Sequence, residues 1–233
     1  MIKQILQIVG ILSAFMALVV FGVNTAYATA GSPVFSQVVS AGTWVGDIVD
    51  ASYVSVTSPT VAMVGVPFSY TCQTATGTLG TATQQIYVSN PQHTTNAWSV
   101  TIAASATTAV WDNATTSDAD YDFNDAGGSG CTDTAETEAD AFGGQMTIDA
   151  NTNGTLAVGQ DADTSLTNVS KGSSAAFDST GTPVNSITLL SATAAADDLG
   201  DWTLQGIDIS QKIPAEQVLG TYGITLVITF AHI

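Results

Sequence analysis

The sequence contains no arginine and only three lysines, Lys3, Lys171 and Lys212, against 20 aspartates and glutamates, which gives a formal net charge of −17. Nucleic acids and anionic lipid surfaces are held mainly by Lys and Arg side chains. The composition therefore argues against nucleic acid or an anionic membrane surface as a partner. Cations, other surfaces and other copies of the chain are left as candidates.

Groups that could serve in catalysis are also scarce. The chain has two histidines, His93 and His232, and a hydrolytic triad needs a base that titrates near neutral pH. His93 lies in the polar stretch 90–96, where we expect a solvated loop residue, and His232 is expected at a frayed end. No glycine-rich phosphate loop or positively charged groove is apparent. We therefore expect a protein that is not an enzyme.

One long apolar run is present, at the N-terminus. Lys3 precedes the apolar run 5–23, and the small residues Ala28 and Ala30 follow it. This order is typical of a secretory signal peptide, expected as an apolar helix that is cleaved after Ala28 or Ala30. An uncleaved anchor is the alternative, because about 19 apolar residues can span a bilayer. We predict a signal peptide over 1–30, and one secreted domain over 31–233 at the extracellular cell surface.

Cysteine is nearly absent, with Cys72 and Cys131 as the two examples. An even number of cysteines in an exported chain favours a disulfide, and two buried free thiols are the alternative. Two cysteines with the distant His93 and His232 do not make a zinc site. A Cys72–Cys131 bond would stabilise the fold by roughly 4 kcal/mol in the loop-entropy treatment.

Beyond the apolar run, no window keeps a 3.6-residue apolar period over three turns. Short stretches with a period of two, bounded by Gly, Asn, Pro or Asp, indicate strands joined by turns. About eight to ten strands at this spacing predict an all-β fold, a single β-sandwich or jelly roll. The clearest stretches are 54–56, 86–88, 98–102, 146–148, 187–189 and 222–230.

The acidic residues are concentrated in one region. Residues 31–110 contain two acids, Asp47 and Asp50, whereas residues 112–163 contain twelve. Within this region, residues 112–145 lose the apolar periodicity and gain five glycines. We predict a long acidic, glycine-rich insertion between strands over 112–145.

Two acidic stretches have the spacing of calcium ligands, since Ca²⁺ takes six to eight oxygen ligands at flexible distances. The first offers Asp118, Asp120, Asp122 and Asp125, and an ordinary strand with a solvated acidic face is its alternative. The second, Asp149 with Asn151 and Asn153, matches half of an EF-type loop with glycine at the sixth place. Its alternative is a β-turn built on Asn153 and Gly154. Calcium is the one cofactor that the sequence suggests.

The four tryptophans have two interpretations. Trp98 and Trp202 fall in alternating stretches, where we expect them to fill the core. Trp44 or Trp111 could instead stack on sugar rings, which would make the chain a carbohydrate-binding module.

A family resemblance rests on the stretches 96–102 and 213–230, which resemble the WxL-type cell-surface domain. In that family an early strand carries Trp-x-Leu or Trp-x-Val, and the final strand reads Gly-x-Tyr-x-x-x-Leu-x-Trp-x-Leu. Trp98 and Val100 match the early strand, Tyr222 and Leu226 match the last, and Ile228 stands at the place of the second tryptophan. A literal Trp-x-Leu occurs one strand earlier, at Trp202 and Leu204.

The resemblance implies a secreted β-sandwich that associates non-covalently with the bacterial cell wall and acts as a structural or adhesive domain. Its partners would be a wall polymer or other surface proteins, and calcium could bridge the acidic domain to an anionic wall.

The stretch 40–44 is also similar to secreted jelly rolls of the TasA and camelysin type. That likeness implies a self-assembling fibre or surface-layer subunit, in which an N-terminal strand completes the sheet of the next copy. Residues 32–39 are apolar and uncharged, so they suit the open edge of a neighbour's sheet. They could equally form the first strand of their own domain. The last stretch, 224–233, is either a central core strand or a second edge that a partner covers.

Overall fold

The computed structural model describes residues 36–115, 119–133, 142–180 and 182–232. The predicted signal peptide lies outside the described residues, as do Asp118 and part of the acidic insertion. The chain divides into two compact units, Met1–Val39 and Ser40–Ile233. The strands all belong to the second unit.

Among the described residues, the second unit is built from antiparallel strands and includes the short 3-10 turn η2 (Gly127–Ser129). The prediction of an all-β fold is confirmed. The strands are β1 (Val45–Val49), β2 (Gln73–Leu79), β3 (Gln85–Ser89), β4 (Trp98–Ala104), β5 (Val110–Asn113), β6 (Tyr121–Asp122), β7 (Met146–Asp149), β8 (Thr155–Val158), β9 (Val169–Lys171), β10 (Ala175–Ala176), β11 (Ile187–Ala192), β12 (Asp201–Gln205), β13 (Ile207–Ile213), β14 (Tyr222–Gly223) and β15 (Leu226–His232).

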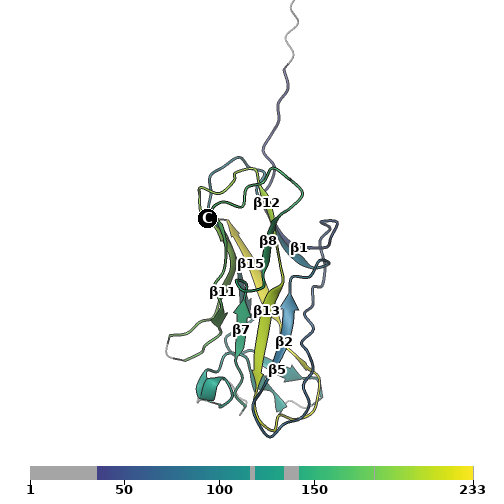
Figure 1. Ribbon diagram of the computed structural model, residues 1–233, viewed down its shortest axis with the longest axis vertical. Helices are drawn as coiled ribbons and strands as arrows, with labels where there is room; N and C mark the ends of the chain where they lie inside the picture. The colour runs from purple at the N-terminus through teal and green to yellow at the C-terminus, as the bar shows by residue number, and fades with distance from the viewer. Residues whose placement is uncertain (1–35, 116–118, 134–141, 181, 233) are drawn as a thin grey trace, which may run out of the picture. The chain divides into compact units, whose positions relative to one another are not determined.

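One layer combines two four-stranded sheets, ordered β1-β3-β12-β8 and β10-β7-β13-β2. Strands β12 and β13 are separated by Gly206 alone. Both pair with the segment that forms β2 and β3: Leu204 lies opposite Ile86, and Ile207 lies opposite Leu79. The segment that forms β7 and β8 pairs with them on the other side. The two sheets therefore follow one another in a single bent layer (Figure 1).

The bend lies at the same level in three neighbouring segments of this layer: at Gly206 between β12 and β13, at Gly80 after β2, and near Asn153 before β8. Gly206 has φ +73° and Gly80 has φ +80°, and the Gly206 N–H donates to the Gly80 carbonyl at 2.7 Å. A Cβ on Gly206 would meet the Asn153 carbonyl oxygen at 3.0 Å. Left-handed backbone and close approach together explain why glycine stands at this position.

Replacing Gly206 with alanine is expected to lower the free energy of unfolding by about 1–2 kcal/mol, the cost of a left-handed conformation for a residue with a Cβ. Urea denaturation checks this. Gly65→Ala is the matched control, because a Cβ there meets nothing within 4 Å. Equal stability of the two variants would contradict the role given to the bend.

The second layer is the sheet β15-β4-β11-β9, and the core lies between the layers. Trp98 on β4 and Trp202 on β12 meet there with ring centroids 5.2 Å apart, and they are 1% and 0% exposed. Trp202 Nε1 donates to the Ser165 carbonyl at 3.0 Å. The expectation that these two tryptophans fill the core is confirmed, and the arrangement is β-sandwich-like.

A small third sheet, β14-β5-β6, lies at one end of the unit, the lower end in Figure 1. Trp111 on β5 stacks on Tyr121 with ring centroids 6.0 Å apart, and Tyr121 meets Tyr222 edge to face. Tyr121 and Phe123 are 4% and 2% exposed. The described part of the acidic insertion therefore packs into the core and is not a wholly solvated loop.

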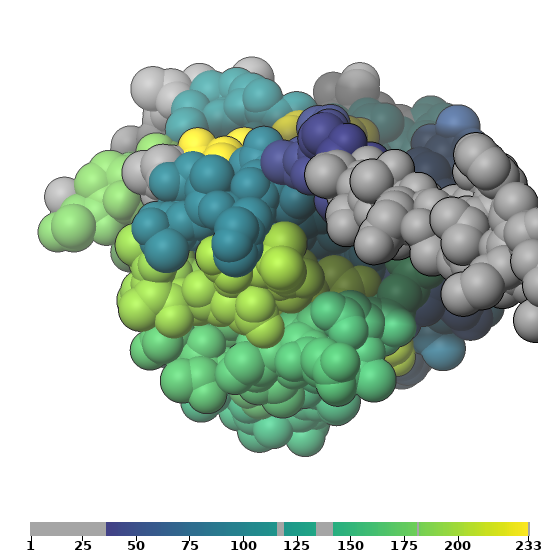
Figure 2. Space-filling model, turned by 90° about the horizontal axis from the view of Figure 1, so that it is seen from above, coloured from purple at the N-terminus to yellow at the C-terminus, as the bar shows by residue number. Residues whose placement is uncertain are grey.

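The opposite end is closed by loops around a buried carboxylate. The segments near residues 90–97, 160–165 and 195–200 lie side by side in Figure 2, joined by backbone bonds such as His93 N–H to the Asp198 carbonyl at 3.0 Å. Asp201 accepts the Tyr87 hydroxyl at 2.9 Å and the backbone N–H groups of Gln160 and Asp161 at 2.7 and 3.0 Å. Asp201 therefore fixes the loop that follows β8.

Three local expectations are wrong. Residues 54–56 form only an isolated bridge, in which Ser55 pairs with Val49. His232 is not a frayed end, because it belongs to β15 and its ring stacks on Trp44 with centroids 5.4 Å apart. Residues 36–44 form no strand, and 36–43 are exposed, so the described part of the N-terminal stretch is not a strand of its own domain.

Candidate functional site

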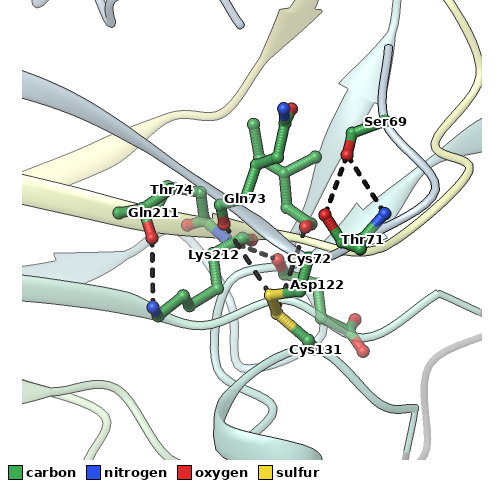
Figure 3. The surroundings of a disulfide bond; sticks show 10 residues. Ser69, Thr71, Cys72, Gln73, Thr74, Asp122, Cys131, Gln211 and Lys212 are labelled. Carbon is green, nitrogen blue, oxygen red and sulfur yellow. Dashed lines mark hydrogen bonds between the residues drawn. A yellow bond between two sulfur atoms is a disulfide. The ribbon is translucent and has the colours of Figure 1, made fainter. Parts of the chain in front are cut away.

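The disulfide ties the acidic insertion to the start of β2. Cys72 and Cys131 are bonded, with Cα atoms 6.0 Å apart and 59 positions apart in sequence, as predicted. Figure 3 shows the bond beside Asp122, Gln211 and Lys212. The Lys212 ammonium donates to Thr74 Oγ1 at 3.0 Å on the same side of the sheet.

An acidic cluster lies next to the disulfide. Oxygen atoms of Asp122, Asp125 and Asp133 lie within 4.8 Å of one another. Asp122 and Asp125 are 1% and 0% exposed, whereas Asp133 is exposed. The Asp125 carboxylate also accepts the Gly127 N–H at 2.8 Å. Buried carboxylates this close repel each other unless cations or hydrogen-bond donors compensate.

The cluster includes two of the four residues predicted for the first calcium site. Asp118 lies outside the described residues, and Asp120 instead accepts the Asn113 N–H at 2.8 Å. Asp133 was not predicted. Its position two residues after Cys131 was the available signal, because the disulfide holds that segment against the sheet.

Chemically, the cluster suits a hard cation. Carboxylate oxygens are the ligands that Ca²⁺ and Mg²⁺ take in proteins. The chain has three basic side chains for 20 acidic ones, so ion pairs within the protein can neutralise few of its carboxylates. The three aspartates can therefore bind a metal ion.

The second predicted calcium loop is closed by its own hydrogen bonds. Asp149 accepts the N–H groups of Asn151 and Thr152, each at 2.9 Å, and the Thr152 hydroxyl at 2.7 Å. These bonds hold the pKa of Asp149 below its ordinary value. The Asn153 amide donates to Asp208 at 2.5 Å.

A lysine ammonium occupies the position in this loop where carbonyl ligands converge. Lys171 Nζ donates to the carbonyl oxygens of Asn151 and Gly154, both at 2.6 Å. The Lys171 ammonium, at the end of β9, therefore supplies the positive charge in this loop and is the hydrogen-bond donor to its two carbonyl oxygens.

Lys171→Met is expected to destabilise the protein by about 1–2 kcal/mol, because two hydrogen bonds from a charged donor are lost at a partly exposed site. Chemical denaturation measures the change. Lys212→Met is the comparison, since that ammonium makes an exposed bond to one hydroxyl. A Lys171→Met protein as stable as the wild type would show that the ammonium does not hold the loop.

An apolar pocket, the seam pocket, lies where the two layers meet along β15. It measures about 580 Å³, and its lining combines three kinds of residue: buried core side chains, the half-buried side of β15, and the segment before β2. Representative members are Ile102, Met146, Ile228, Phe230 and Met63. The pocket is open to solvent, so it is a groove in the surface beside the edge strand.

Strand β15 is the edge of its sheet. Its seven residues pair with β4 in register from Leu226 opposite Ala104 to His232 opposite Trp98. No other described strand pairs with β15. Its sequence is uncharged apart from the terminal His232, and such an edge presents free backbone groups to an added strand. Of the two alternatives for this stretch, the edge is correct.

The tryptophans considered for sugar stacking are engaged within the protein. Trp111 is 8% exposed, stacks on Tyr121, and donates from Nε1 to Gln211 at 2.8 Å. Trp44 is partly buried against His232. His93 is 72% exposed at its side chain, and its Nδ1 lies 3.0 Å from the Asp198 carboxylate.

No helix in the described part of the chain is long and apolar enough to cross a membrane. Comparison with known proteins finds no family model that matches this chain, and no curated protein or solved structure matches it either.

Proposed function

We propose that this chain is a non-enzymatic, exported structural protein of the cell surface, folded as one β-sandwich of the jelly-roll type, whose copies join by strand exchange. In this proposal the N-terminal stretch 32–39 of one copy adds to β15 of the next. The single observation that carries it is the seam pocket beside the uncharged, unpaired edge of β15, described above.

The N-terminal stretch has the properties that such an edge requires. Residues 31–46 carry no charged side chain, and the described residues of the stretch, 36–39, are exposed and outside the sheets. Val38 and Val39 are 86% and 88% exposed. Adding an apolar strand to the β15 edge would bury such side chains in the seam, and each buried Val or Ile contributes about 1.5–3 kcal/mol.

Deleting residues 32–39 tests the proposal. The full mature chain is expected to form concentration-dependent assemblies, seen by analytical ultracentrifugation and as filaments by negative stain. The deletion variant is expected to stay monomeric with an unchanged circular dichroism spectrum. If the deletion variant assembles like the full chain, strand exchange by this stretch is wrong.

Association with a cell wall, as in the WxL-type domain, is the second candidate. The observation that favours it is that the two strands carrying the family's motifs are neighbours, with Val100 of β4 opposite Phe230 of β15. Its partner would be a wall polymer. Cosedimentation of the deletion variant with isolated cell walls separates the two functions. If the variant does not assemble but still pellets with the walls, the domain binds the wall independently of strand exchange.

We further propose that the ion bound by Asp122, Asp125 and Asp133 is Ca²⁺, which would brace the insertion against the disulfide. Calcium at 100 times its dissociation constant stabilises a folded protein by about 2.7 kcal/mol. Calcium is therefore expected to raise the melting temperature of the wild type by several degrees.

Asp133→Asn is expected to reduce this calcium effect, and Asp163→Asn, at another exposed acid, is expected to preserve it. Differential scanning calorimetry with calcium and with chelator makes the comparison. Identical calcium responses of the two variants would contradict the assignment of the site.

A further inference from the structure

A second pocket, the terminal socket, lies at the end of the unit where the disulfide and the small third sheet are found. It measures about 420 Å³. Trp111, Tyr121 and Gln211 line it together with the segments 61–69, 213–214 and 217–222. None of its described lining residues is charged. Burial raises the pKa of Tyr121 well above its ordinary value, so this hydroxyl also stays neutral.

Large, solvent-exposed apolar side chains surround the socket. Val64 and Leu219 are 62% and 75% exposed, and Phe68 and Val218 are 47% and 44% exposed. Contiguous exposed apolar surface on a soluble domain marks an interaction site. On a chain of net charge −17, this surface is one where few carboxylates would oppose a second copy, and the exposed Glu216 stands between its lining residues.

The terminal socket adjoins the seam pocket. Both pockets are lined by Val61, Met63, Trp111 and Tyr222. Asp47 is the only charged residue among the described linings of the two. We call these two adjoining pockets together the groove; their described linings run from β15 to the socket and are nearly uncharged.

The chain contains one segment that matches this groove. Residues 31–46 are uncharged, and Phe35 is the only aromatic residue between Gly31 and Thr43. Residues 31–39, which lie in the separate first unit, span about 30 Å when extended at roughly 3.3 Å per residue. Aromatic anchors in desolvated pockets contribute most of the binding energy in protein interfaces.

We propose that the terminal socket is the anchor site of the strand exchange: it receives the Phe35 side chain of a second copy, and the residues that follow Phe35 add to the β15 edge. The inference rests on the proposed function and names the part of the groove that gives it affinity and direction. The backbone edge of β15 accepts any strand, whereas the aromatic socket selects this segment.

Two single variants of the full mature chain test the anchor. Phe35→Ala removes the inserted ring, and Leu219→Asp places a charge at the socket rim. Each is expected to weaken assembly at least tenfold by sedimentation velocity. Leu199→Asp is the matched control, because Leu199 is 52% exposed and lines neither pocket, and it is expected to assemble like the wild type.

Site-specific photo-crosslinking locates the ring directly. Benzoylphenylalanine at position 35 is expected to give intermolecular crosslinks to the segments 61–69 and 213–222, identified by mass spectrometry. Crosslinks to β15 alone, or unchanged assembly of Phe35→Ala and Leu219→Asp, would overturn the socket and leave strand exchange standing. Crosslinks only within one copy, with no assembly of the wild type, would overturn both.

Discussion

The structure depends on the closure of one apolar core between two antiparallel layers, and this closure is uneven. Trp98 and Trp202 meet at van der Waals distance in the middle of the core, and the loops around Asp201 close one end. Along β15 the layers leave the seam pocket. A domain that buries most of its apolar surface but leaves a sheet edge such as β15 unpaired is stable alone and still gains by adding a strand.

The distribution of charge limits which segments could pair with the open edge of β15. The carboxylates lie mainly in the insertion and in surface loops, and the groove from β15 to the terminal socket has one acid, Asp47, in its described lining. The lining of this groove therefore offers little charge repulsion to an acidic partner. The same separation of charge from apolar surface gives the acidic cluster a different task, because Asp122 and Asp125 are buried beside the disulfide and suit a cation.

Much of the fold could be predicted from the sequence where Val, Ile and Thr alternate. The strands β3, β4, β7 and β11 lie where the period of two placed them. Strand β2 was not predicted, because its sequence consists of Thr, Ala and Gly around few apolar residues. The stretch 54–56 has the right alternation but meets only the end of β1, where Ser55 bridges to Val49, so it forms a bridge and no longer strand.

The sites were less predictable, because they depend on contacts between distant residues. Asp133 joins Asp122 and Asp125 through the path of the chain around the disulfide, and spacing alone pointed to Asp118 and Asp120. The loop at Asp149 has the signature of a calcium loop, yet Lys171, 20 positions after Asn151, supplies its cation. The groove has no local motif at all, since its walls come from the segment before β2, the third sheet and β15.

The central claim is that β15 is an open edge that a second copy covers, and amide hydrogen exchange of β15 tests it most directly. In dilute solution, the N–H groups of Leu226–His232 that do not pair with β4 are predicted to exchange close to the unprotected rate. They are predicted to become strongly protected once the protein assembles. Equal protection of these amides in the dilute and the assembled protein would contradict the account.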